Sequence, residues 1–161
     1  MSTKTVIDLF CGGGGFTLSA SMAGFNVTTS VDLDSTLTSS HKYNFPKSKL
    51  LLSDIATLSG KELVRKNGGV PNGIIGGPPC QGFSLIGKRK PDDERNNLLF
   101  HFFRLVSEIQ PDFFVMENVP GLLSPTSKNY LEEALKIVKK DYVVVEPKLS
   151  LIHISEPTRP Y

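Results

Sequence analysis

Short apolar runs recur along the chain, and each is bounded by glycine, proline or acidic residues. They are rich in valine, isoleucine, leucine and phenylalanine, a composition typical of buried strands. Strands are therefore predicted over residues 4–10, 26–34, 49–55, 71–77, 112–119 and 142–146.

Between these runs the apolar residues recur at helical spacing, which predicts amphipathic helices. In "NYLEEALKIVKK", for example, Leu131, Leu135 and Val138 share one face. Residues 78–95 show no period, so a long loop is expected there. Helices are expected over residues 17–25, from about 35 to 44, and over 60–69, 96–110 and 129–140.

This alternation of strands and helices predicts the fold class. Strand–helix–strand units usually place their strands parallel in one sheet, so we expect an α/β fold with a doubly wound, mostly parallel sheet and helices on both faces. Such sheets bind ligands at the carboxyl ends of their strands. Motifs with chemical potential are therefore sought where the predicted strands end.

Composition and charge set only loose limits on function. The chain has 161 residues, 39% hydrophobic and 21% charged, with a formal net charge of +2. This fits one domain with a real core, and the weak charge neither requires nor excludes a nucleic-acid partner. The sequence starts without a long apolar run, and no stretch approaches the roughly 20 apolar residues of a membrane span, so we expect a cytoplasmic protein.

Cysteine and histidine give little sign of a metal site. Cys11 and Cys80 are expected to be reduced in the cytoplasm, and two isolated cysteines are too few for structural zinc. No metal is expected. His41 and His101 are interpreted as ordinary surface or helix residues, and Cys11 as a packed thiol.

The first candidate motif is "DLFCGGGGF", residues 8–16, at the end of the first predicted strand. Glycines at this point let the backbone turn sharply and approach a ligand at the start of the next helix. The stretch lacks the GxGxxG spacing of dinucleotide binders, so a pyrophosphate ligand is not favoured. A glycine-rich turn with no ligand is the alternative.

Acidic residues end the second and third predicted strands. Asp32 lies roughly 20 residues beyond the glycines, where an acid can accept hydrogen bonds from ribose hydroxyls, with Leu33 packing on a base. Asp34 is predicted to cap the following helix. Asp54 could accept a hydrogen bond from an adenine amino group, or it could only cap a helix.

The second pair of motifs is "GGPPCQGFS", residues 76–84, and "MENV", residues 116–119. Cys80 follows the fourth strand and Glu117 ends the fifth, so adjacent strands would bring thiol and carboxyl into one cleft. A buried carboxyl can hold a proton near neutral pH, and a thiolate beside a proton donor forms a nucleophilic site. The alternative is that Cys80 is an inert, small apolar residue.

With these motifs in this order, the sequence resembles the S-adenosylmethionine-dependent DNA (cytosine-5)-methyltransferases from about residue 4 to residue 148. The resemblance implies a Rossmann-like methyltransferase sheet. It also implies that the Cys80 thiolate adds to carbon 6 of cytosine, while Glu117 contacts N3 and stabilises its protonation. The methyl group then passes from S-adenosylmethionine to carbon 5.

The resemblance assigns roles residue by residue. The implied catalytic group is Cys80, Glu117, Pro79, Gln81, Asn118 and Arg95. The implied cofactor-binding group is Asp8, Phe10, Gly12, Gly14, Gly15, Asp32, Leu33, Asp54, Ile55, Pro78 and Leu99.

The partner implied by the resemblance is double-stranded DNA with the target cytosine flipped out of the helix. Residues 84–96, "SLIGKRKPDDERN", could close over the DNA with Lys88, Arg89 and Lys90 near phosphates. A solvated charged loop is the alternative, since the neighbouring acids offset this charge. A cognate restriction endonuclease in the same system is a further implied partner, without a stable complex.

The C-terminal residues depart from the family pattern. Further strands, a target-recognition domain and a closing helix would be expected after residue 148, so we interpret residues 1–148 as a partial catalytic domain, incomplete at its C-terminal strands. Residues 149–161 match one reading frame of a transposase-type sequencing adapter and are expected to be non-native, with a divergent terminus as the alternative. We expect such a fragment to be poorly stable and inactive alone, with the strand over residues 112–119 at a sheet edge.

Two other functions stay open from the sequence. A tRNA cytosine-5 methyltransferase would carry the same motifs, although the glycine after Gln81 favours DNA. A non-catalytic cofactor-binding fragment or subunit is the other alternative.

Overall fold

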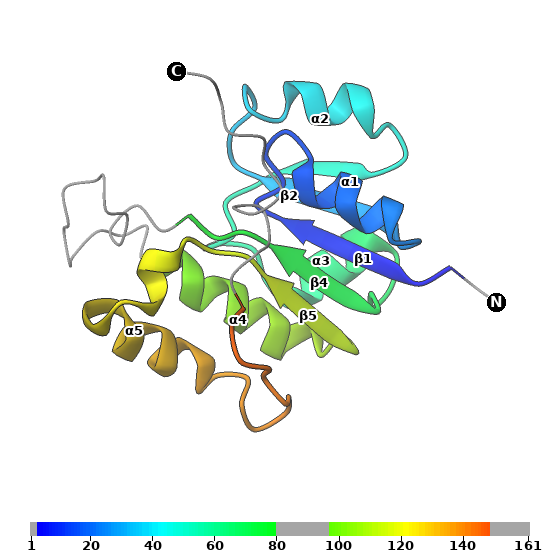
Figure 1. The fold of residues 1–161 in the computed structure, drawn as a ribbon. Helices are drawn as coiled ribbons and strands as arrows, with labels where there is room; N and C mark the ends of the chain where they lie inside the picture. The colour runs from blue at the N-terminus through cyan, green and yellow to red at the C-terminus, as the bar shows by residue number, and fades with distance from the viewer. Residues whose placement is uncertain (1–2, 80–96, 149–161) are drawn as a thin grey trace, which may run out of the picture.

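The computed structural model describes residues 3–79 and 97–148 (Figure 1). Cys80, the loop that follows it and the tail over 149–161 lie outside the described residues. The described elements are, in chain order, β1 (Thr5–Leu9), α1 (Gly15–Met22), β2 (Asn26–Asp32), α2 (Ser39–Asn44), β3 (Lys49–Leu52), α3 (Gly60–Asn67), β4 (Gly73–Gly76), α4 (Asn97–Ile109), β5 (Phe113–Met116), the 3-10 helix η2 (Pro120–Leu123) and α5 (Pro125–Leu135).

The strands form one parallel sheet in the order β3-β2-β1-β4-β5. The chain moves outward from β1 to β3 and then returns to the other side of β1 to add β4 and β5. This reversal makes the sheet doubly wound and puts its switch point between β1 and β4. The predicted α/β class is confirmed, and β5 forms an edge of the sheet in the described part of the chain, as expected.

Alternation along β1 separates two apolar layers, because successive side chains of a strand point to opposite faces. Ile7 and Leu9 are fully buried in the larger core with the aromatic residues of α4. Val6 lies in a smaller core on the other face, where Phe16 of α1 packs. Helices therefore cover both faces, as Figure 1 shows.

The predicted sixth strand over residues 142–146 is wrong. Residues 142–148 form no strand pairing with any described residue, although the Tyr142 hydroxyl donates to the Pro111 carbonyl at 2.7 Å. The alternating apolar pattern survives, since Tyr142 and Val144 pack towards the core while Val143 is exposed. An alternating pattern is not sufficient for a strand, because a strand also needs a neighbour that supplies ladder hydrogen bonds.

The helices differ from the sequence predictions in two further places. The last helix begins at Pro125, before the amphipathic stretch, and ends at Leu135 with hydrogen-bonded turns after it. The 3-10 helix η2 was not predicted. His41 in α2 and His101 in α4 are helix residues, as interpreted, although His41 is fully buried and His101 is partly buried.

A buried polar network joins α1 to the sheet. The Thr17 hydroxyl lies 2.6 Å from Asp8 Oδ2, to which it donates, and 3.0 Å from His41 Nε2. Asp8 and His41 are both fully buried, and neither Asp8 Oδ1 nor His41 Nδ1 has a hydrogen-bond partner among the described residues. These contacts fix the start of α1 against β1 and α2.

Burial controls the charge of this network. It raises the pKa of Asp8 to about 7, against the lowering effect of the Thr17 hydrogen bond, and Asp32 adds a smaller repulsion. Burial also lowers the pKa of His41, which Asp32 partly opposes. The network therefore favours a protonated Asp8 and a neutral His41.

Replacing Gly76 with alanine should destabilise the fold strongly. A Cβ at Gly76 would lie 2.4 Å from the Leu9 carbonyl oxygen, a backbone atom that cannot move without disturbing the β1–β4 pairing. We expect a loss of about 2 kcal/mol or more in unfolding free energy, measured by urea denaturation. Gly15→Ala is the control, because its Cβ would meet no atom within 4 Å, and its stability should change by less than about 1 kcal/mol. Equal effects of the two substitutions would contradict this.

Asp8→Asn should change how stability depends on pH. Because folding raises the pKa of Asp8, the folded state binds more protons, and the wild-type chain loses stability as pH rises from about 4 to about 7. Asparagine does not titrate, so the unfolding free energy of the variant should rise relative to that of wild type across this window. The gain should be at most roughly 1.4 kcal/mol per pH unit. The measurement is urea unfolding at a series of pH values.

Comparing wild type with Asp8→Asn separates the effect of Asp8 on stability from the effects of other titrating groups nearby. The lowered pKa of His41 costs stability as pH falls below about 6.5, with the opposite slope, but both chains carry His41 and its contribution cancels. The Cys11 thiol titrates well above the window. A difference between the two chains that stays constant with pH would show that Asp8 has no raised pKa.

Candidate active site

The carboxyl ends of the five parallel strands lie on one side of the sheet, and the predicted motifs follow them. After β1 the backbone turns through left-handed conformations, with φ of 62° at Phe10, 47° at Gly12 and 101° at Gly14. A Cβ at Gly14 would also lie 2.3 Å from the ring of Phe45. The glycine motif is thus required by backbone geometry and close packing, whatever ligand it binds.

Asp32 connects the end of β2 to this glycine turn. Its Oδ2 accepts a hydrogen bond from the Gly12 amide at 2.9 Å, and its Oδ1 accepts one from the Asp34 amide at 2.9 Å. The side chain is partly exposed and keeps lone pairs for a further donor. The carboxylate therefore has a structural role beside its predicted role towards a ribose.

The residues after Asp32 agree only in part with their predicted roles. Leu33 is 69% exposed and free to pack against a planar group. Asp34 accepts hydrogen bonds from the amides of Thr36 and Leu37, so it caps a turn. The prediction that Asp34 caps the next helix is wrong, because α2 begins only at Ser39, after Thr38.

The predicted adenine-side residues lie close to β3 and α4. Asp54 is partly buried, and its Oδ1 accepts the Ala56 amide at 2.8 Å, which stabilises its own turn. Ile55 and Leu99 are almost fully buried in the same apolar core. The structure thus brings Ile55 and Leu99 into one cluster, although they are far apart in the sequence.

The proline and glutamate motifs meet at the ends of β4 and β5. Asn118 Nδ2 donates to the Pro78 carbonyl at 3.1 Å, and the Glu117 amide donates to the Gly76 carbonyl at 3.0 Å. A Cβ built at Gly77 would lie 3.2 Å from Glu117 Oε2, so the carboxylate rests against the chain shortly before Cys80.

Some predicted catalytic features are not found or not described. Glu117 is exposed, so the expectation of a buried carboxyl is wrong for this structure. Pro79 is partly buried at the end of the described segment. Cys80, Gln81 and Arg95 lie outside the described residues, as do Lys88, Arg89 and Lys90.

Cys11 behaves as a packed thiol. It is 5% exposed, and burial raises the pKa of the thiol to about 12, with Asp8 and Asp32 adding repulsion. A thiol with so high a pKa stays protonated at neutral pH and is a poor nucleophile. This agrees with the prediction that Cys11 is not a second nucleophile.

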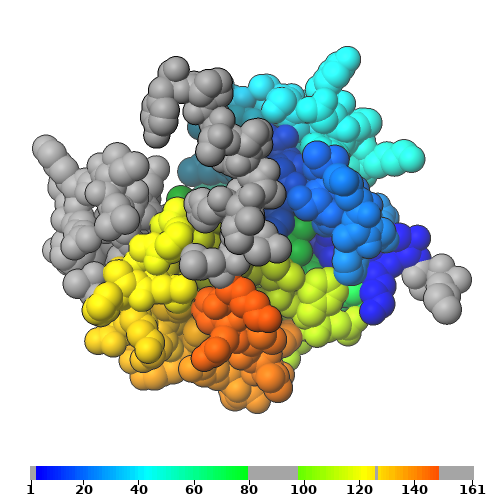
Figure 2. Space-filling view, viewed as in Figure 1, coloured from blue at the N-terminus to red at the C-terminus, as the bar shows by residue number. Residues whose placement is uncertain are grey.

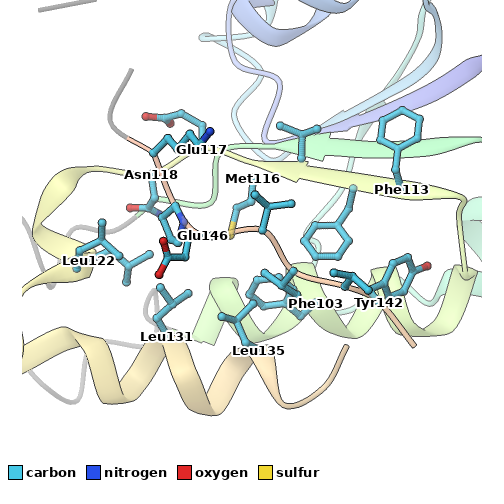
Figure 3. Close-up of a pocket in the computed structure, with 18 of the residues that line it drawn as sticks. Phe103, Phe113, Met116, Glu117, Asn118, Leu122, Leu131, Leu135, Tyr142 and Glu146 are labelled. Carbon is cyan, nitrogen blue, oxygen red and sulfur yellow. The ribbon is translucent and has the colours of Figure 1, made fainter. Parts of the chain in front are cut away.

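A cavity of about 1280 Å³ lies along the edge strand β5. Figure 3 shows Met116, Leu131 and Leu135 around it, with Glu117 and Asn118 at the end of β5. Residues 141–148 form another wall, and Figure 2 shows this segment lying against α5. The cavity wall includes Glu117 and Phe16, the last residue of the glycine motif, but not Asp32 or Gly12.

Arg104 lies near the predicted site but belongs to none of the sequence motifs. It donates to the carbonyl oxygens of Ile55 and Leu58. Its sequence signal is a four-residue spacing from Glu108, with which it forms a salt bridge at 2.8 Å. Such spacings are common on exposed helix faces and do not by themselves indicate a site.

The described residues contain neither a candidate membrane span nor a candidate metal site. In the described ranges, no helix combines the length and apolarity needed to cross a bilayer. The same ranges contain no group of three or more His, Cys, Asp or Glu residues arranged to hold a metal ion.

Comparison with known sequences points to one family. Residues 4–148 match the family model for C-5 cytosine-specific DNA methylase. The Type II methyltransferase M.XorII of Xanthomonas oryzae pv. oryzae is 43% identical over 140 residues, covering 84% of this chain and 33% of M.XorII. M.DdeI of Desulfomicrobium norvegicum is 44% identical over 124 residues, covering 77% of this chain and 30% of M.DdeI.

Solved structures agree with this assignment. A protein described as a DNA modification methyltransferase, encoded within an E. coli prophage, has a TM-score of 0.80 and 42% identity over 89% of this chain and 40% of its own. Spodoptera frugiperda DNMT2 has a TM-score of 0.64 and 28% identity over 84% of this chain and 41% of its own. The chain spans about a third of the length of the two curated relatives. Because the family model covers nearly all of its length, the chain belongs to the C-5 cytosine-specific DNA methylase family.

Proposed function

We propose that the chain is the cofactor-binding and nucleophile-bearing part of an S-adenosylmethionine-dependent DNA (cytosine-5)-methyltransferase. The observation that carries the proposal is the hydrogen bond from Asn118 to the Pro78 carbonyl. It ties the glutamate motif to the turn that leads into Cys80, and Glu117 lies against the same turn. A nucleophile and a proton donor for one cytosine ring require this juxtaposition.

The chemistry explains why a thiol and a carboxyl are both needed. Carbon 5 of cytosine is too weak a nucleophile to take a methyl group directly. The Cys80 thiolate adds to carbon 6 while Glu117 stabilises the proton on N3, which makes the ring enamine-like. S-adenosylmethionine supplies an electrophilic methyl group for carbon 5. Loss of the carbon 5 proton then expels the thiolate and restores the aromatic ring.

The residues around the glycine turn fit the cofactor's polar groups. Asp32 keeps acceptor capacity for the ribose hydroxyls while its Gly12 hydrogen bond fixes its position. Helix α1 begins after Gly14 without a side-chain cap, so its first amide groups can receive the carboxylate of the methionine portion. Leu33 and Ile55 would flank the adenine, with Asp54 near its amino group and Leu99 beneath Ile55.

DNA is favoured as the substrate over tRNA. The family model is a DNA methylase, and the curated relatives reported above carry the name Type II methyltransferase. A cytosine inside a duplex is inaccessible to this chemistry, so it must be flipped out of the stack. Under this proposal a cognate restriction endonuclease would recognise the same DNA, without forming a stable complex.

Trapping of a covalent adduct tests the proposed reaction. DNA containing 5-fluorocytosine cannot lose a proton from carbon 5, so methylation should leave the enzyme linked to the DNA. The complete reading frame that contains these residues should form an adduct that survives denaturing electrophoresis in the presence of S-adenosylmethionine.

Cys80→Ser should abolish this adduct, whereas Cys11→Ala should keep it, because Cys11 is a packed thiol with a raised pKa. An adduct that survives the loss of Cys80 would contradict the assignment. Labelled methyl transfer to tRNA in place of DNA would identify the other substrate class.

Cofactor binding gives an independent test. Asp32→Asn should weaken binding of S-adenosylhomocysteine by about 10- to 100-fold in calorimetry, because hydrogen bonds to a charged group contribute about 1.5–3 kcal/mol. Asp34→Asn is the matched control, since Asp34 is exposed and caps a neighbouring turn. Its affinity should stay within about twofold of wild type. Equal losses in both variants would remove the ribose-binding role from Asp32.

A further inference from the structure

We propose that Arg104 is a positioning residue for the adenine end of the cofactor, because it anchors the backbone of residues 55–60 to helix α4. This inference rests on the proposed function. Arg104 does not belong to the predicted catalytic or cofactor-binding set, and it acts through the backbone that carries Asp54 and Ile55.

The guanidinium holds this segment at two points. Its Nη2 donates to the Ile55 carbonyl at 2.9 Å and to the Leu58 carbonyl at 3.0 Å. The two carbonyls belong to the turn over residues 54–58. At the start of this turn the Asp54 carbonyl accepts hydrogen bonds from the amides of Thr57 and Leu58. Arg104 thus satisfies backbone acceptors that the turn itself leaves open.

Glu108 extends the anchor to the start of α3. Its Oε1 accepts from Arg104 Nη1 at 2.8 Å, and its Oε2 accepts the Gly60 amide at 2.5 Å. A Cβ at Gly60 would lie 2.6 Å from the Glu108 Cβ, so this close approach requires glycine. The Arg104–Glu108 pair therefore holds both ends of the segment.

His101 fixes the orientation of the guanidinium. Its Nδ1 accepts from Arg104 Nε at 3.1 Å, which requires a neutral ring. Burial and the charge of Arg104 lower the pKa of His101, although Asp54 and Glu108 act in the opposite direction. The N–H donors of the guanidinium are consequently oriented towards the turn at residues 55–58.

The position of Arg104 on α4 connects it to the residues predicted to contact the adenine. The same helix carries Leu99, about 1.4 turns before Arg104, and Leu99 packs in the core with Ile55. On the sheet side the segment is tied by the Ser53 amide, which donates to the Asp32 carbonyl at 2.9 Å. Residues 54–58 are thus tied to β2 on one side and to α4 on the other, where Arg104 donates the hydrogen bonds.

The test compares Arg104→Met and Arg104→Lys with Lys128→Met in the full chain. Lys128 is an exposed member of another (i, i+4) pair, with Glu132, on α5. Hydrogen exchange followed by NMR needs no ligand. In Arg104→Met, exchange at Ala56, Thr57 and Leu58 should accelerate about tenfold or more, while the β1 and β4 amides keep their protection.

Calorimetry then measures the consequence for binding. Arg104→Met should weaken S-adenosylhomocysteine about tenfold, but should leave the affinity for S-ribosylhomocysteine, which lacks adenine, unchanged. Arg104→Lys should fall between, because an ammonium keeps the charge but cannot span both carbonyls and Glu108. It also replaces Arg104→Met if that variant does not fold. Lys128→Met should match wild type in both measurements.

Three results would overturn the inference. They are unchanged exchange at residues 56–58, faster exchange with unchanged S-adenosylhomocysteine affinity, and equal loss for both ligands. Failure of the wild-type chain to bind S-adenosylhomocysteine would instead contradict the proposed function. The hydrogen-exchange comparison would still test whether Arg104 anchors the backbone of residues 55–60.

Discussion

Parallel pairing of β1 with β2 on one side and β4 on the other brings the separate motifs of this chain to one edge of the sheet. Strands that run in the same direction end at the same edge, so Phe10, Asp32 and Gly77 come together without any contact that selects them individually. The spacing of β1 and β4 leaves no room for a side chain at Gly76, where a Cβ would lie 2.4 Å from the Leu9 carbonyl oxygen. The glycine motif after β1 and the proline motif after β4 both depend on this spacing.

Two aspartates at this edge show how burial divides structural and ligand-facing roles. Asp8 points to the face covered by α1, where burial raises its pKa and the Thr17 hydroxyl supports it. Asp32 is partly exposed and is held by backbone amides, with acceptor capacity left for a ligand. The resemblance assigned both to the cofactor, and that role stays a prediction for both. For Asp8 the described structure adds a hydrogen bond from Thr17, which ties it to α1.

Sequence patterns predicted the helix–strand order, the parallel sheet and the strand-end location of the motifs because these depend on local periodicity and chain direction. The strand predicted over residues 142–146 failed because these residues do not pair with the free side of β5, and periodicity alone cannot predict pairing. The burial of His41 was not predicted because it comes from contacts between α1 and α2. Arg104 carried only the common spacing from Glu108, and its partners in the turn at residues 55–58 are backbone carbonyls, which every sequence contains.

The exposure of Glu117 constrains how the proposed reaction could work. A carboxyl that accepts or donates a proton during catalysis needs an environment from which bulk water is excluded. Glu117 borders the cavity along β5, but its side chain is exposed at the end of its strand. In the proposed reaction the flipped cytosine would have to provide that cover. The catalytic environment would then form only when substrate binds, whereas the hydrogen bonds of Asp32 and Arg104 hold the predicted cofactor side without a ligand.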